Sequence, residues 1–157
     1  MKTSRIITNG IIIFLGIGIY FLIMDALGLS RNIYLRLLNF AFVFYGVNRT
    51  LQGNFREGID GYFTNLGAAF LTSFTGLVLS VFCFMEYAVY KGGQTYLEKL
   101  HATYIFGGHT PSPYQFGASL FLEGLAASMV VSFTLMQYWK DKVEKINTID
   151  DAAHNPH

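Results

Sequence analysis

Four long apolar stretches divide the chain, and more polar segments separate them. The clearest stretch is 65–90, in which Glu86, close to the far end, is the only charged residue. As a helix its roughly 26 residues would extend about 39 Å, which exceeds the hydrocarbon core of a bilayer at about 30 Å. We therefore expect this stretch to cross a membrane.

The other apolar stretches are 6–27, 32–51 and 117–139. A turn of only a few residues separates the first two, so they should form antiparallel neighbours. The pattern predicts an all-α integral membrane four-helix bundle over 1–139, followed by a polar cytoplasmic tail at 140–157.

Two connecting segments have amphipathic character. In 53–64, Phe55, Ile59 and Phe63 recur at every fourth position with charged residues between them. Segment 94–106 places leucines and tyrosines on one helical face. Both patterns are typical of short interfacial helices that lie in the headgroup region with the apolar side toward the membrane.

The distribution of Lys and Arg indicates the orientation. With both termini in the cytoplasm, seven basic residues lie inside and four lie outside, which accounts for all eleven. The inner set is Lys2, Arg5, Arg49, Arg56, Lys140, Lys142 and Lys145, and the outer set is Arg31, Arg36, Lys91 and Lys99. The positive-inside rule therefore predicts an N-in, C-in topology.

Small residues recur along the predicted spans at spacings of two to four positions, which favours close approach of neighbouring helices. The predicted packing residues are Gly16, Gly18, Ala69, Ser73, Gly76, Ser80, Gly124 and Ser128. This pattern predicts tight packing within the bundle or self-association.

Each predicted span contributes one ionisable residue at a similar depth near the outer face: Asp25, Arg36, Glu86 and Glu123. A charge at the centre of a membrane helix costs roughly 2.5 to 3.5 kcal/mol on insertion scales, so such groups usually face the interior and pair. We expect Arg36 to pair with Glu123 or Glu86. The four residues form either a clamp between helices, or a proton or cation site, or the polar end of a ligand pocket.

Composition excludes several classes of function. The chain is 52% hydrophobic and 13% charged with a net charge of +1, so it has no basic footprint for nucleic acid. The single cysteine, Cys83, excludes an internal disulfide and a CxxC pair. No histidine lies in a predicted span, and no P-loop, GxSxG or HExxH motif occurs. We therefore expect no metal and no cofactor.

The run from Gly61 to Tyr90 begins with Gly61-Tyr62-Phe63, continues through Asn-Leu-Gly-Ala-Ala-Phe, and ends in Phe-Met-Glu-Tyr. It resembles a family of uncharacterised four-helix membrane proteins from bacteria, grouped as a domain of unknown function. The resemblance implies a four-helix fold in the bacterial inner (plasma) membrane and transfers no active residues.

A second resemblance is to the small trimeric membrane glutathione transferases, on the basis of size and helix count. That family has an Arg, an Asn and an acidic residue in close register on its second span. Arg36 and Asn39 are present here, but the acidic residue is absent.

Insertion and packing account for most of the sequence, which favours a structural or accessory protein of interaction type over an enzyme. Its expected partners are the lipid bilayer and a membrane protein or further copies of itself. One alternative is a small proton- or cation-linked transporter or channel that uses the outer acidic cluster. Another is a membrane enzyme acting on a lipid-like substrate.

Overall fold

Helices form almost all of the computed structural model, which describes residues 2–30, 32–101 and 112–143. They are α1 (Thr3–Ala26), α2 (Ile33–Arg36), α3 (Asn39–Arg56), α4 (Tyr62–Tyr90), α5 (Gln94–His101) and α6 (Pro113–Val143). The described residues contain no strand, so the prediction of an all-α fold is confirmed.

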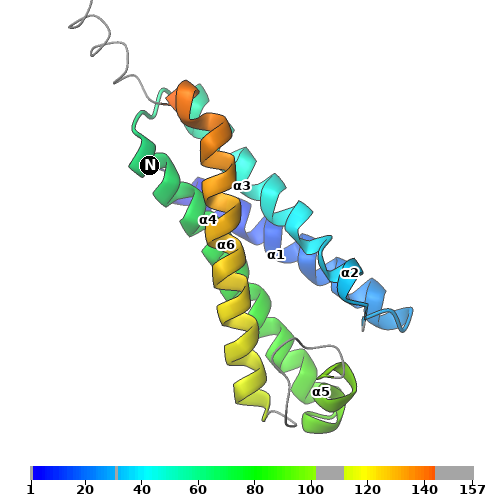
Figure 1. Cartoon of the computed structure of the whole chain (residues 1–157). Helices are drawn as coiled ribbons and strands as arrows, with labels where there is room; N and C mark the ends of the chain where they lie inside the picture. The colour runs from blue at the N-terminus through cyan, green and yellow to red at the C-terminus, as the bar shows by residue number, and fades with distance from the viewer. Residues whose placement is uncertain (1, 31, 102–111, 144–157) are drawn as a thin grey trace, which may run out of the picture.

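The central helix of the bundle is α4, because it packs extensively along both α1 and α6 and also contacts α3 and α5. In addition, α1 packs along α3, and α3 contacts α6. In Figure 1, α1 and α3 run together toward α2, whereas α4 and α6 run together toward α5. The two pairs diverge, so the bundle widens toward the end that carries α2 and α5.

The opposite end, which holds the start of α1 and the end of α6, is closely packed. Glycines bring the backbones together there: a Cβ added at Gly76 of α4 would lie 2.7 Å from Cγ2 of Ile13 and 3.1 Å from the carbonyl oxygen of Gly10. Small residues at such crossings are typical of helix pairs in membranes. The buried core at this end comprises Ile13, Val47, Leu51, Ala69, Val131, Met136, Trp139 and Val143.

Both ends of the described chain lie at this packed end. The ammonium of Lys2 is 2.7 Å from the carboxylate of Glu57, in the turn after α3. The backbone N–H of Gly61 donates to the carbonyl oxygen of Val143 at 3.0 Å. The hydrogen bond from Lys2, followed by that from Arg5, holds the pKa of Glu57 below its ordinary value of 4.5.

Within the described residues, three helices are long and apolar enough to cross a membrane: α1, α4 and α6. They match the predicted spans 6–27, 65–90 and 117–139. Each helix begins three or four residues before its predicted start, and α6 also ends four residues later than predicted.

The second predicted span, 32–51, differs from the structure. It is divided into α2 and α3, and α3 continues to Arg56. At the junction, the N–H of Leu37 bonds to the carbonyl of Tyr34 and the N–H of Phe40 to that of Leu37, so the turns tighten to a spacing of three residues. The 18 residues of α3 include many polar side chains, and this helix is not among the three that meet the length and hydropathy of a span.

The prediction of an interfacial helix over 53–64 is wrong. The first part of this segment is the last turn of α3, the last part is the first turn of α4, and a turn at 57–61 joins them. Gly58 and Gly61 adopt φ angles of +68° and +100°, which interrupt a helix and suit glycine. The apparent period of four came from the ends of two different helices.

The second predicted interfacial helix, 94–106, is helical as α5 to His101, and its remainder lies outside the described residues. Its apolar side faces the rest of the protein. Leu97 is fully buried and packs with Ala88 of α4 and Phe116 of α6 in a small separate core. The tail beyond Val143 also lies outside the described residues.

Candidate functional site

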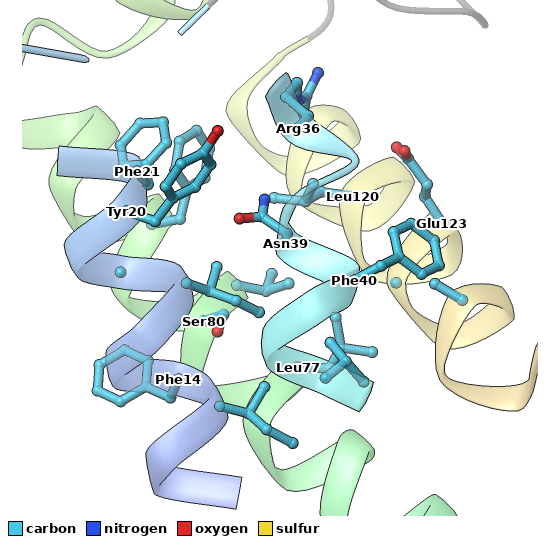
Figure 2. A pocket seen from close by; sticks show the side chains of 18 of the residues that line it. Phe14, Tyr20, Phe21, Arg36, Asn39, Phe40, Leu77, Ser80, Leu120 and Glu123 are labelled. Carbon is cyan, nitrogen blue, oxygen red and sulfur yellow. The ribbon is translucent and has the colours of Figure 1, made fainter. Parts of the chain in front are cut away.

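A cavity of about 660 Å³ lies where the helix pairs diverge. Residues of α1, α2, α3, α4 and α6 line it, and Figure 2 shows the labelled side chains of these helices around it. Its volume is within the range of about 300 to 1,000 Å³ that is usual for sites that bind small molecules.

The cavity is about as deep as one leaflet of a bilayer. On α1 its lining extends from Ile13, in the packed core, to Met24, near the end of the helix. At 1.5 Å per residue these positions are about 17 Å apart along the helix axis, and the whole hydrocarbon core is about 30 Å thick.

The walls of the cavity are predominantly apolar. Phe21 of α1 meets Phe84 of α4 edge to face with ring centroids 5.3 Å apart, and Phe84 stacks on Phe116 of α6 at 5.8 Å. Phe14, Leu77 and Val43 line it at greater depth. Such a surface suits a hydrocarbon chain.

Polar groups line the cavity at different depths. Arg36 of α2 and Glu123 of α6 lie on its wall toward the wide end of the bundle (Figure 2). The hydroxyl of Tyr20 donates to the carbonyl oxygen of Leu35 at 2.8 Å. This bond satisfies a backbone group next to the α2–α3 junction and ties α1 to α2.

Asn39 and Ser80 line the cavity farther in than Arg36, and Ser80 is the deeper of the two in Figure 2. Their Oδ1 and Oγ atoms are buried and, within residues 2–30, 32–101 and 112–143, have no hydrogen-bond partner. Figure 2 shows the Asn39 carboxamide pointing from α3 toward α1, and Ser80 on α4 between these helices. Leaving a buried polar group unpaired costs about 1 to 3 kcal/mol, so these two atoms are favourable sites for a ligand's polar group.

The structure does not gather the four predicted ionisable residues at one place. Arg36 and Glu123 line the cavity, and Glu86 does not; both glutamates are exposed. Asp25 accepts hydrogen bonds from the hydroxyls of Tyr87 at 2.7 Å and Tyr96 at 2.9 Å. The pairing of Arg36 with Glu123 or Glu86 stays a prediction.

The interactions of Asp25 fasten α5 and the end of α4 to the end of α1. Lys91 lies 3.8 Å from the Asp25 carboxylate. Burial, and then the hydrogen bond to Asp25, raises the pKa of Tyr96 well above its usual range, so its hydroxyl stays protonated and continues to donate.

Most of the predicted packing residues lie at contacts between helices. Ala69, Ser73, Gly76 and Ser128 are buried, a Cβ added at Gly16 would meet Phe42, and one added at Gly124 would meet Leu77. Five of the eight also line the cavity: Gly18, Ser73, Ser80, Gly124 and Ser128. A Cβ added at Gly18 would have no atom within 4 Å.

A buried polar network at the packed end was not predicted from the sequence. The Asn9 amide donates to the hydroxyl of Thr50 at 2.9 Å, and this hydroxyl is 3.0 Å from that of Thr72. The Asn54 amide donates to Asn65 at 3.0 Å and accepts from Arg5 at 2.7 Å. The network joins α1, α3 and α4.

A signal for this network was present in the sequence. Thr50 and Asn54 are four residues apart, and Asn65 and Thr72 are seven apart, which places each pair on one face of its helix. Polar residues on one face of otherwise apolar membrane helices usually bond across to a neighbouring helix.

Comparison of the chain with protein-family models, with curated proteins and with solved structures gives no match. Among the described residues, no three His, Cys, Asp or Glu side chains gather where they would hold a metal ion. The cavity is the candidate functional site of the described part of the chain.

Proposed function

We propose that this chain is a multi-pass membrane protein of binding, accessory type that holds the apolar chain of an amphiphile in its cavity. The observation that carries the proposal is the cavity itself, with a volume of about 660 Å³, apolar walls and a depth of about one leaflet. An amphiphile from the outer leaflet would place its chain among the phenylalanines and its polar end toward Arg36 and Glu123. A membrane protein partner or a homo-oligomer is compatible with this role.

The proposed topology has four membrane-crossing helices, with both termini on the cytoplasmic side of a bacterial inner membrane. The contacts of Lys2 with Glu57 and of Gly61 with Val143 support termini on one side. The polar residues of α3 do not oppose a fourth span, because Thr50 and Asn54 are buried and hydrogen-bonded.

The topology is tested with single cysteines in a Cys83→Ser background. Thr3 and Gln94 are both exposed, at the packed and the wide end of the bundle respectively. We expect a membrane-impermeant maleimide to label Gln94→Cys in intact cells, and to label Thr3→Cys only after the membrane is permeabilised. Labelling of both variants in intact cells would contradict four spans.

A transporter driven by the outer acidic cluster has less support, because Asp25 is held by Tyr87 and Tyr96 and Glu86 is exposed. A lipid enzyme also has less support, because its reacting groups would have to come from Arg36, Glu123 and the uncharged polar side chains of the cavity.

Filling the cavity should weaken binding of the ligand's acyl chain. In Gly18→Trp the indole would occupy the cavity without meeting a neighbouring atom at its Cβ. With a photoactivatable diazirine analogue of palmitate, we expect labelling of the lining segments of α4 and α6 in the wild type and about a tenfold loss in Gly18→Trp, equivalent to about 1.4 kcal/mol of binding free energy.

The matched control is Gly67→Trp. Gly67 is also within a helix with no atom within 4 Å of an added Cβ, but it does not line the cavity. Its labelling should equal that of the wild type, and thermal unfolding should show that both variants are folded. Undiminished labelling of the lining segments in folded Gly18→Trp would overturn the proposed function.

A further inference from the structure

We propose that the amphiphile bound in the cavity carries a secondary amide next to its acyl chain, and that Asn39 and Ser80 recognise this amide. The inference rests on the proposed function, because it names the class of ligand that the cavity binds. It starts from the two buried polar atoms, Asn39 Oδ1 and Ser80 Oγ, that find no hydrogen-bond partner in the described part of the chain.

The chemistry of these two atoms defines the ligand group that complements them. A carboxamide oxygen such as Asn39 Oδ1 only accepts hydrogen bonds, so it requires an N–H or O–H from the ligand. The Ser80 hydroxyl donates one hydrogen bond and also accepts, so it can bind a carbonyl oxygen. A secondary amide has an N–H donor and a carbonyl acceptor on adjacent atoms, whereas an ester has acceptors only.

The position of the two residues fits the junction between a headgroup and a chain. Asn39 is three residues beyond Arg36, so it lies about one helical turn deeper in the cavity. Ser80 is seven residues from both Ser73 and Tyr87, which mark the limits of the lining on α4. A ligand amide bound here would leave space for the ligand's polar headgroup toward the wide end of the bundle.

The part of the cavity between these two polar atoms and the packed end of the bundle suits an acyl chain. Val43, Leu77 and Ile13 line the deeper part of the cavity, and the apolar residues of the packed core close its floor. The cavity thus has an apolar compartment, a level of hydrogen-bonding groups, and charged side chains toward the wide end. An N-acylated amino acid or a similar acyl amide has its groups in the same order.

The test uses two amphiphiles that differ in one group. N-palmitoylglycine contains the amide, and palmitoyl glycolate is the same molecule with an ester oxygen in place of the N–H. Each competes with the photoactivatable palmitate analogue for the purified full-length protein in detergent micelles. We expect the amide to compete at about tenfold lower concentration than the ester, because only the amide supplies a donor to Asn39.

Two variants assign the preference to the polar atoms. Asn39→Leu and Ser80→Ala each remove one unpaired buried atom and keep the apolar cavity. The readout is the ratio of amide to ester competition within each variant, so it does not depend on the affinity of that variant for the palmitate analogue. We expect Asn39→Leu to lose the preference for the amide. The Gly18→Trp variant should lose binding of both competitors.

The possible outcomes separate the inference from the proposed function. Equal competition by amide and ester, with the palmitate analogue still bound in the cavity, would overturn the amide inference and leave the proposed function standing. An amide preference that persists in Asn39→Leu would also overturn it. Absence of cavity labelling by the palmitate analogue would instead overturn the proposed function.

Discussion

Replacement of Gly76 by isoleucine is expected to destabilise the bundle more than any other single change at a glycine of α4. A Cβ at this position would lie 2.7 Å and 2.9 Å from Cγ2 and Cβ of Ile13, and 3.1 Å from the carbonyl oxygen of Gly10. The nearest obstacles are the base of a buried side chain and a backbone atom, which cannot rotate away. The expected loss is about 3 kcal/mol of the free energy of unfolding.

The measurement is thermal unfolding in detergent, followed by the fluorescence of Trp139. This residue is the only tryptophan of the chain and is buried in the packed core, so it reports on the region where Gly76 lies. Gly67→Ile in the same helix is the matched control, because no atom lies within 4 Å of an added Cβ at Gly67. Equal unfolding temperatures for the two variants would show that the α1–α4 contact does not limit stability.

Asn65→Leu is expected to have the second largest effect. Asn65 accepts from the amide of Asn54 at 3.0 Å and donates to the carbonyl oxygens of Ile59 and Gly61, both at 3.0 Å. Leucine has a similar size but would leave the buried Asn54 amide and the Ile59 carbonyl without this partner, whereas the Gly61 carbonyl would still accept from the backbone N–H of residue 65. Because each unpaired buried group costs about 1 to 3 kcal/mol, we expect the free energy of unfolding to fall by about 3 kcal/mol.

Limited proteolysis and thermal unfolding together check this expectation. The turn at 57–61 should become more susceptible to cleavage, because Asn65 holds two of its carbonyls. Gln52→Leu on the exposed side of α3 makes a comparable polar-to-apolar change and should shift stability by less than about 0.5 kcal/mol. A stable, protease-resistant Asn65→Leu protein would mean that the network contributes little to the fold.

The sequence was sufficient to predict α1, α4 and α6, because each is a long and nearly continuous apolar run. It was not sufficient for α3. The polar side chains in its second half ended the predicted span at 51, although Thr50 and Asn54 turn inward and bond to α1 and α4. A hydropathy pattern assigns polar residues to water and contains no information about a partner on another helix.

The cavity could not be predicted because it arises from the divergence of the two helix pairs. Residue spacing gives the depth of a side chain in the membrane but not the side of the bundle that it faces. Asp25 and Arg36 were therefore expected in one cluster with Glu86 and Glu123, whereas Asp25 bonds to Tyr87 and Tyr96. The same limit applies to Gly18, which has the spacing of a packing residue but lines the open space.

The polar network also bears on how the chain assembles during its synthesis. The bonds of Asn9 with Thr50 and of Arg5 with Asn54 join α1 to α3 before any part of α4 is required. An emerging hairpin of the first two long helices can thus shelter its own polar groups from lipid. The later arrival of Thr72 completes the network, so the order of translation matches the order in which these bonds become available.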